Sequence, residues 1–382
     1  MKNPRRPRVS AFAAALVLFW MGIVACAQPV TPPPIAARAY LLTDLLSGQA
    51  LAAANENDRF EPASLTKLMT AYVVFQAIRD GRLDPARPVT VSQAAAKASG
   101  SRMFITAGKS VAVPDLLRGM VVQSGNDAAV ALAEAVAGSE DAFVTLMNRE
   151  AQRMGLANTH FANATGQPAQ GHYSSARDLA ALATAVIRDF PEHYPLYSMK
   201  EFGYSGISQT NRNRLLWTDP TVDGMKTGFT EAAGYCIVAS AKRGERRLIS
   251  VVLGTQSDTL RTSESQKLLN FGFQAYETRR LYKKGEAVAS PVIYKGTKSA
   301  VALGFDRDIW LTLPRERFAG MSAVLETRQP FVAPLAAGQK AGIMKLARGN
   351  APVAEFPVVA LEDVPVAGFL SRGWDTLRLM FR

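Results

Sequence analysis

The chain has 382 residues, of which 48% are hydrophobic and 20% charged. This balance is typical of a folded globular protein and excludes collagen-like, coiled-coil and disordered chains. At about 150 residues per domain, the length predicts two or three domains. Lys and Arg outnumber Asp and Glu by 44 to 32, giving a net charge of +12. With three histidines and two cysteines, we expect no disulfide framework, metal or other cofactor.

Residues 1–27 have the pattern of a secretory signal peptide. Four basic residues between positions 2 and 8 precede an uncharged apolar run over 11–25, which is shorter than the ~20 residues of a membrane-spanning helix. Small residues predict cleavage before Gln28, although the same stretch also fits lipidation of Cys26. Both alternatives predict export, so nucleic acid is not an expected partner, and an anionic envelope surface suits the charge better.

The next part of the chain predicts a domain over residues 37–284, after a proline-rich extended leader at 28–36. Two apolar runs joined by Ser47-Gly48 predict a hairpin, and an apolar pattern of helical period follows at 63–80. A helical block between an opening hairpin and closing strands indicates an α+β or three-layer domain. The expected elements are strands at 39–46, 50–53, 235–241 and 248–253 and helices at 63–80, 113–120, 128–136, 142–154, 176–188 and 263–278.

Residues 285–362 change to short β-rich runs separated by Pro and Gly, which predicts a small all-β second domain. The runs lie at 292–294, 309–313, 323–327, 342–346 and 356–360.

The last segment, 363–382, predicts an amphipathic helix. Leu370, Trp374, Leu377 and Phe381 share one face, while Arg372, Asp375, Arg378 and Arg382 lie opposite. Such a helix could dock on the core of the protein itself. Its composition and terminal position favour a helix lying in a membrane interface, and its charges exclude a spanning helix.

The first chemical motif is Ser64-Leu65-Thr66-Lys67, at the start of the long apolar helix. Residues three apart lie on one helix face, so the Lys67 amine can reach the Ser64 hydroxyl. Taken alone, the motif also fits a helix cap followed by a solvated lysine. Because this helix is apolar on several sides, we expect it to be buried. Burial favours the neutral amine, the form that can accept a proton from Ser64.

Two more motifs follow in a fixed order. Ser124-Gly125-Asn126 lies between two predicted helices, and Lys226-Thr227-Gly228 precedes the strand at 235–241, where it can line a sheet edge. Each motif alone fits a cap or a turn. Together, the order S-x-x-K, S-x-N, K-T-G is the signature of penicillin-binding proteins and class A β-lactamases.

More of the sequence resembles the low-molecular-mass penicillin-binding proteins that act as serine-type D-alanyl-D-alanine carboxypeptidases, and the resemblance covers nearly the whole mature chain. It implies a penicillin-binding protein/β-lactamase-like transpeptidase domain, a helical block against an antiparallel sheet, followed by a β-rich domain and a membrane anchor at the periplasmic face of the inner membrane. The matching stretches are 100–104, 163–166, 172–174, 176–178, 213–217 and 261–272.

The resemblance implies acyl transfer through a serine ester. Ser64 would attack the carbonyl between the last two D-alanines of a peptidoglycan stem peptide, with Lys67 taking its proton. Ser124 would pass a proton to the departing D-alanine. The backbone N–H groups of Ser64 and Phe229 would form the oxyanion hole. β-Lactams are expected to acylate the same serine.

The resemblance also implies the binding residues. Asn126 would hold the substrate backbone and Lys67. Lys226, Thr227 and Gly228 would bind the terminal carboxylate end of the peptide, with Arg261 as a helper.

Some features separate this chain from its relatives and from other functions. Phe229 stands where some relatives have histidine, so the rate of deacylation is not implied. A β-lactamase would need a glutamate in an E-x-x-x-N loop, and none of the glutamates between the second and third motifs has Asn four residues on. An endopeptidase that cuts cross-links, or a non-catalytic wall-binding protein, remains an alternative.

Overall fold

The structure is a computed structural model, and it describes residues 30–380. The predicted signal peptide, with its cleavage site before Gln28 and with Cys26, lies outside the described residues, as do Phe381 and Arg382. Residues 30–36 form neither helix nor strand, as expected for the leader.

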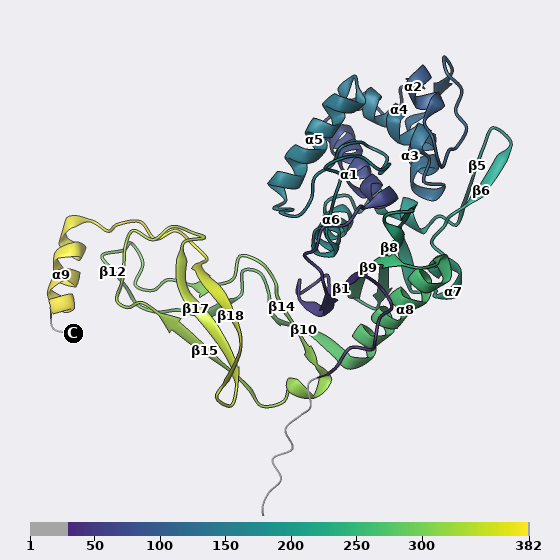
Figure 1. Cartoon of the computed structure of the whole chain (residues 1–382). Coiled ribbons are helices and arrows are strands. Elements are labelled where there is room, and N and C mark those ends of the chain that lie inside the picture. Colours follow the sequence, from purple (N-terminus) through teal and green to yellow (C-terminus); the bar gives the residue numbers. More distant parts are fainter. Residues whose placement is uncertain (1–29, 381–382) are drawn as a thin grey trace, which may run out of the picture. The chain divides into compact units, whose positions relative to one another are not determined.

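A five-stranded antiparallel sheet lies at the centre of the first domain (Figure 1), in the order β2-β1-β9-β8-β7. The predicted opening hairpin and both predicted closing strands are present. Strand β7, which carries Lys226-Thr227-Gly228, was not among the expected strands, but it forms an edge of the sheet, where the motif was expected to lie. The strands are β1 Ala39–Asp44, β2 Ala50–Ala54, β7 Val222–Thr230, β8 Gly234–Arg243 and β9 Arg246–Thr255.

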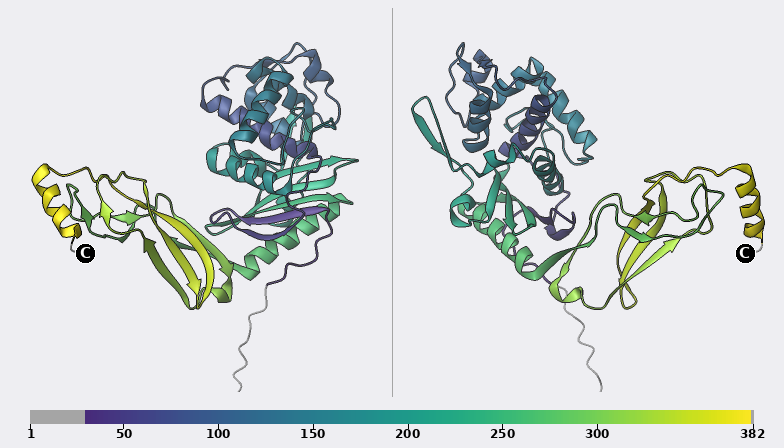
Figure 2. Two further views of the ribbon diagram at one scale, coloured as in Figure 1. Left: turned by 60° about the vertical axis from the view of Figure 1, so that its left-hand side comes forward. Right: turned by 180° about the vertical axis from the view of Figure 1, so that it is seen from behind.

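Each face of the sheet is covered by helices. Successive residues of a strand point to opposite faces, and because the central strands are apolar at successive positions, both faces must be buried. Leu41 and Val251 pack into the core under the helical block. Their neighbours Leu42 and Val252 pack on the other face, against helix α8 (Asp258–Ala275). Figure 2 shows the sheet between these two layers. The domain is therefore three-layered, one of the two predicted architectures.

Helix α1 (Lys67–Arg79) is the central helix of the block, and one turn of 3-10 helix (Ala63–Thr66) precedes it. Every residue of α1 from position 67 to 75 is buried, which confirms the expected burial. The other predicted helices are confirmed as α3 Val113–Val122, α4 Asn126–Ala137, α5 Glu140–Arg153 and α6 Ala176–Asp189.

Several short elements were not predicted, because they have too few residues to establish a hydrophobic period. They are β3 Val89–Thr90, α2 Gln93–Lys97, β4 Ser110–Val111, β5 Glu201–Tyr204, β6 Ile207–Thr210 and α7 Leu215–Thr218.

The predicted bounds of the last helix, 263–278, were wrong at both ends. The helix begins at Asp258, because the Ser257 hydroxyl accepts from the Leu260 N–H as its N-cap. It ends at Ala275, because Tyr276–Tyr282 forms strand β10 and pairs with β14 (Ile309–Pro314). Backbone pairing with a distant strand thus overrides the local helical pattern.

The second domain is all-β, as predicted. A five-stranded sheet has the order β11-β13-β18-β17-β15, and β12 pairs in parallel with β16. Buried side chains of these strands form a separate core. The bounds are β11 Ala287–Ala289, β12 Ile293–Tyr294, β13 Leu303–Gly304, β15 Met321–Thr327, β16 Phe331–Val332, β17 Lys340–Arg348 and β18 Ala351–Ala360.

The predicted terminal helix is present as α9 (Phe369–Met380), although the side chains of Leu370 and Leu377 lie outside the described ones. Phe369 and Trp374 are exposed, so these two aromatic rings do not dock on the core. Within residues 30–380 no helix is long and apolar enough to cross a bilayer.

Candidate active site

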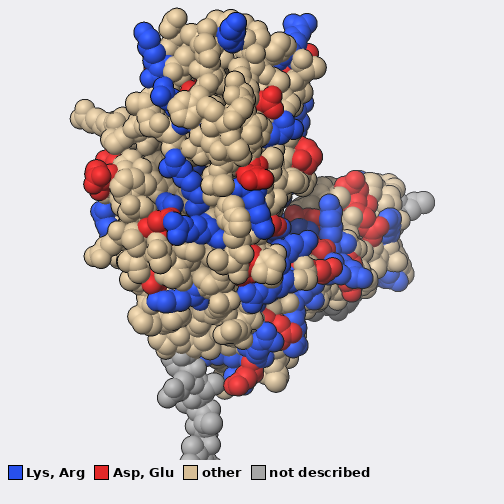
Figure 3. All heavy atoms as spheres, turned by 90° about the vertical axis from the view of Figure 1, so that its right-hand side faces the viewer, with Lys and Arg blue, Asp and Glu red and all other residues tan. Residues whose placement is uncertain are grey.

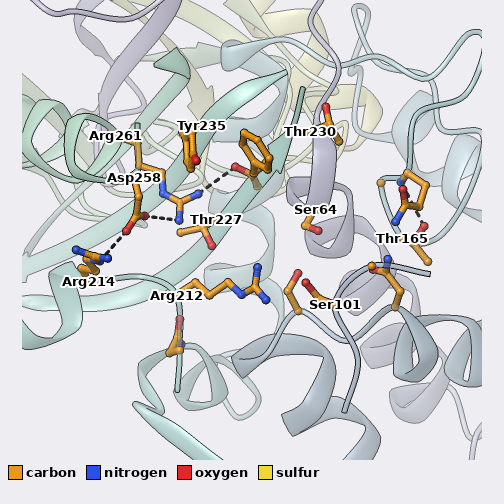
Figure 4. Close-up of a pocket in the computed structure, with 18 of the residues that line it drawn as sticks. Ser64, Ser101, Thr165, Arg212, Arg214, Thr227, Thr230, Tyr235, Asp258 and Arg261 are labelled. Carbon is orange, nitrogen blue, oxygen red and sulfur yellow. Dashed lines mark hydrogen bonds and ion pairs between the residues drawn. The ribbon is translucent and has the colours of Figure 1, made fainter. Parts of the chain in front are cut away.

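The three sequence motifs meet at one cavity of about 690 Å³ in the first domain (Figure 4). Ser64, Ser124 and Asn126 line it together with Thr227 and Gly228. Lys67 and Lys226 are buried behind the lining residues. Segments separated by more than 100 residues in the sequence thus form a single polar groove.

Ser64 lies in the 3-10 turn, and Lys67 is the first residue of α1. The Lys67 Nζ atom is 3.1 Å from the Ser64 Oγ atom, as the spacing of the motif predicted. The amine is also 2.6 Å from both Asn126 Oδ1 and the Thr165 carbonyl oxygen. It is therefore held by three oxygens in a buried position.

The pKa of Lys67 is lowered from 10.5 to about 7, mainly because burial penalises the ammonium form and in addition because of the positive charge of Arg212. The negative charge of Asp127 acts in the opposite direction. A substantial fraction of the amine is thus neutral at neutral pH.

The contacts of this neutral amine determine where its lone pair points. A neutral amine has two N–H donors and one lone pair. The amide oxygen of Asn126 and the carbonyl of Thr165 can only accept, so they take the two N–H groups. The lone pair is left for the hydroxyl of Ser64, which can supply a proton.

Ser124 has a strained backbone and a hydroxyl without a partner. Its φ is 66°, a left-handed conformation that is uncommon for a residue other than glycine. Its buried Oγ atom has no hydrogen-bond partner among the described residues. Strain of this kind costs about 1–3 kcal/mol and is concentrated at functional sites. Ser124 lines the cavity, so a bound ligand could supply the missing hydrogen-bond partner.

Asp127 was missed by the sequence analysis, although it directly follows the second motif. Its buried carboxylate accepts from the backbone N–H groups of Met103, Phe104 and Ile105 at 2.8–3.2 Å. The Asn126 N–H donates to the Ser101 carbonyl at 2.7 Å. Helix α4 thereby fixes the segment over 101–105 beside the cavity.

Strand β7 passes close to the turn that carries Ser64, and Gly228 makes this approach possible. A Cβ atom at Gly228 would lie 3.1 Å from both the Cβ of Ala63 and the carbonyl oxygen of Pro62. The backbone of the neighbouring Phe229 can therefore face the serine across the cavity. The glycine of the third motif is needed for packing.

Lys226 is buried, and its amine donates to the Thr227 carbonyl oxygen at 3.0 Å. Desolvation lowers its pKa well below 10.5, and the positive charges of Lys67, Arg212 and Arg261 lower it further. The basic groups of Lys67, Arg212 and Arg261 therefore lie within electrostatic range of Lys226. An anionic ligand in the cavity would relieve their repulsion.

Arg261 lines the cavity near Gly228. From the sequence it is expected to assist in binding the terminal carboxylate. It donates to the Gly228 carbonyl oxygen at 3.1 Å and pairs with Asp258 at 2.5 Å. Asp258 also pairs with Arg214 at 2.6 Å. The side chain of Arg261 is thus held in place before any ligand binds.

Arg212 was not predicted, because it follows the unpredicted hairpin β5–β6 and belongs to no recognisable motif. Figure 4 shows its side chain extending into the cavity between Thr227 and Ser101. A guanidinium stays charged in proteins and suits a carboxylate. Basic side chains are also spread over the face of the molecule in Figure 3, with acidic ones among them.

Gly166 gives a direct test of how tightly the cavity wall packs. Its φ is +86°, and a Cβ atom would lie 1.8 Å from the Ala63 carbonyl oxygen. We expect Gly166→Ala to lower the free energy of unfolding by at least about 2 kcal/mol, measured by urea denaturation, since it adds a backbone clash to the strain. Gly171→Ala is the control: its φ is +77°, but the nearest atom to its Cβ would be 3.9 Å away. Equal losses in both variants would contradict the close packing at Gly166.

Comparisons with known proteins agree with this geometry. Residues 26–257 match the D-alanyl-D-alanine carboxypeptidase family, and residues 276–366 match the C-terminal domain of penicillin-binding protein 5. The chain is 42% identical to D-alanyl-D-alanine carboxypeptidase DacC of Escherichia coli (strain K12), over 98% of this chain and 95% of that protein.

Solved structures give the same result. Penicillin-binding protein 5 from Haemophilus influenzae superimposes with a TM-score of 0.86 at 42% identity, covering 88% of this chain and 100% of that one. Penicillin-binding protein D2 from Listeria monocytogenes, in an ampicillin-bound form, has a TM-score of 0.59 at 31% identity, over 65% of this chain and 100% of that one. The fold is therefore that of the penicillin-binding proteins. Within this class, the chain belongs to the D-alanyl-D-alanine carboxypeptidase family.

Proposed function

We propose that this protein is a serine-type carboxypeptidase that removes the terminal D-alanine from peptidoglycan stem pentapeptides. The observation that carries the proposal is the position of the Lys67 amine 3.1 Å from the Ser64 hydroxyl, with its two N–H groups held by Asn126 and Thr165. Membership of the D-alanyl-D-alanine carboxypeptidase family supports the choice of substrate.

In the first step the Ser64 oxygen attacks the carbonyl carbon of the penultimate D-alanine, while its proton moves to Lys67. The backbone N–H groups of Ser64 and Phe229 stabilise the negative oxygen of the tetrahedral intermediate, at about 3 kcal/mol of barrier per donor. The C–N bond then breaks; Ser124 gives its proton to the leaving D-alanine nitrogen and takes the proton held by Lys67, which becomes neutral again. Water finally hydrolyses the ester and restores the free serine.

The cationic end of the cavity is the proposed site for the free carboxylate of the peptide. Thr227, Arg261 and the buried Lys226 come from the third motif and α8, and Arg212 lies among them. A carboxylate bound there would place the last peptide bond near Ser64. This requirement for a free carboxylate favours a carboxypeptidase over a general peptidase.

The test measures D-alanine released from a stem pentapeptide by the purified mature chain. We expect one D-alanine and one tetrapeptide per turnover. The same pentapeptide with a C-terminal amide should be cleaved at least about 100-fold more slowly, because the cationic groups would lose their charged partner. Faster cleavage of cross-linked peptide dimers than of pentapeptide would identify an endopeptidase instead.

β-Lactams are expected to acylate Ser64. The similarity of this chain to penicillin-binding protein D2, whose structure was solved in an ampicillin-bound form, supports this expectation. Among the described residues lining the cavity, the acidic one is Asp258, and it is paired with Arg214 and Arg261. It is therefore poorly placed to act as the base that a β-lactamase uses to hydrolyse its acyl-enzyme. We expect the penicilloyl ester to be long-lived.

The pKa of Lys67 gives a pH prediction with a defined sign. The neutral amine is the active base, so acylation should rise with pH through about 7. Arg212→Gln removes a positive charge that lowers this pKa, so the rise should move to higher pH and the rate at pH 6 should fall. The measurement is the pH profile of acylation by a fluorescent penicillin. Arg214→Gln is the control, since Arg214 lines the same cavity but is not among the charges that shift the pKa of Lys67. If the pH profile of Arg212→Gln is the same as that of the wild type, the assignment of Lys67 as the titrating base is contradicted.

The proposed location is the outer face of the cytoplasmic membrane. The predicted signal peptide supports export, and the terminal amphipathic helix supports peripheral attachment. The exposed aromatic rings of Phe369 and Trp374 on α9 suit the membrane interface.

A further inference from the structure

The second domain has an exposed apolar face next to α9. In the parallel pair β12–β16, Ile293 lies opposite Phe331, and both are buried in the core of the domain. Because side chains alternate along a strand, Val292 and Val332 point to the other face. Val292 is 57% exposed and Val332 is 40% exposed.

Helix α9 is attached to the chain that directly follows β12, and Figure 1 shows the two elements near each other. The segment that leads into the helix pairs with the residues after β12. Val366 forms an antiparallel bridge with Gly296, and the Ala367 N–H donates to the Lys295 carbonyl oxygen at 2.8 Å. The Asp375 carboxylate then accepts from the Lys295 N–H at 2.6 Å. The helix is therefore tied to β12 at its entry and again near its middle.

Three further apolar side chains at the junction with α9 are exposed. Val366 is exposed, and Phe369 and Trp374 on α9 are 85% and 62% exposed. Together with Val292 and Val332, they account for five of the ten large hydrophobic side chains that are exposed in the described chain. Arg372 and Arg378 on α9 are exposed beside them. Trp with valine, flanked by arginine, is the composition that suits the interfacial zone of an anionic bilayer.

We propose that the outward face of β12–β16 and the exposed side of α9 form one membrane-contact surface, so that the second domain itself enters the interfacial zone of the bilayer. The inference rests on the proposed membrane attachment through α9 and adds a second contact to it. Asp375 acts as the positioning residue, because its bond to Lys295 fixes the helix relative to the strands.

An environment-sensitive fluorophore tests this contact directly. Val332→Cys and Val292→Cys would be labelled with NBD in the mature chain, where Cys236 is buried and burial raises its pKa to about 11, so that it reacts poorly. On vesicles of phosphatidylglycerol and phosphatidylethanolamine, both labels should shift to shorter wavelength and brighten severalfold. Val324→Cys is the matched control, a valine with the same 57% exposure on β15 of the same domain; its label should not change.

The outcomes separate this inference from the proposed function. Vesicle binding with no change at position 332 would show that α9 alone holds the protein, and would overturn the inference. A failure to bind vesicles would overturn both membrane proposals while leaving release of D-alanine untouched. Dimers in lipid-free solution that dissociate in Val332→Ser would assign the face to a second copy and also overturn it.

Substitution of Asp375 tests the positioning step. Asp375→Ala removes the acceptor for the Lys295 N–H, so vesicle binding should persist while the shift at Val332→Cys is lost. Asp375→Asn keeps an acceptor oxygen and should retain the shift. A shift that persists in Asp375→Ala would refute the role of Asp375.

Discussion

Ser64→Ala is expected to abolish both release of D-alanine and covalent labelling by penicillin. Among the described residues, the amine of Lys67 contacts one hydroxyl, that of Ser64, which can give up a proton, and two carbonyl oxygens, which cannot. The substitution removes this hydroxyl. Removing the nucleophile of a serine hydrolase costs on the order of 10⁶ in kcat. Intact-mass analysis after incubation with benzylpenicillin should show one adduct on the wild type and none on the variant.

The same experiment has a matched control. Ser263→Ala removes an exposed hydroxyl outside the cavity and should be acylated like the wild type. The substitution at Ser64 introduces no cavity or clash, so the thermal transition of the protein should stay within a few degrees of the wild type. An adduct that persists in Ser64→Ala, or that appears on another residue, would refute Ser64 as the nucleophile.

Lys67→Arg is expected to slow acylation by at least about 10³-fold, although Ser64 remains. An arginine keeps its proton at any physiological pH, so it cannot accept the one from Ser64. Proton transfer by a positioned base contributes about 10²–10⁴ to the rate. A guanidinium is also larger than the amine, which is enclosed by Ser64, Asn126 and Thr165 within 3.1 Å. The measurement is the second-order rate constant of acylation by a fluorescent penicillin.

The control for this substitution is Lys97→Arg, at an exposed lysine at the end of α2, which should leave the rate unchanged. Lys67→Ala separates loss of the base from steric conflict, because it removes the amine without adding volume. Both Lys67 variants should be slow. If Lys67→Ala acylates at a rate near that of the wild type, another group must take the proton, and the proposed role of Lys67 is wrong.

Much of the fold could be predicted because the long elements carry their own pattern. The apolar period of α1 can be recognised in the sequence, and so can the continuous apolar runs of β8 and β9, which are buried because both faces of the sheet are covered. The end of α8 could not be predicted, because the residues from Tyr276 onward pair as a strand with β14, which lies far along the chain (Tyr276 pairs with Pro314). Short elements such as α2 contain too little period to recognise.

The candidate site divides in the same way. The amino-acid sequence alone determined the three motifs and the one-turn spacing that brings Lys67 to Ser64, since a helix converts a separation of three residues into contact. Only the tertiary structure decided the rest. It brings Arg212 and Asp127 within electrostatic range of Lys67, and it directs the lone pair of the amine by the positions of Asn126 and Thr165. The reason is that charge, desolvation and hydrogen bonding act through space, and residues 59 to 145 positions from Lys67 become its neighbours only when the chain has folded.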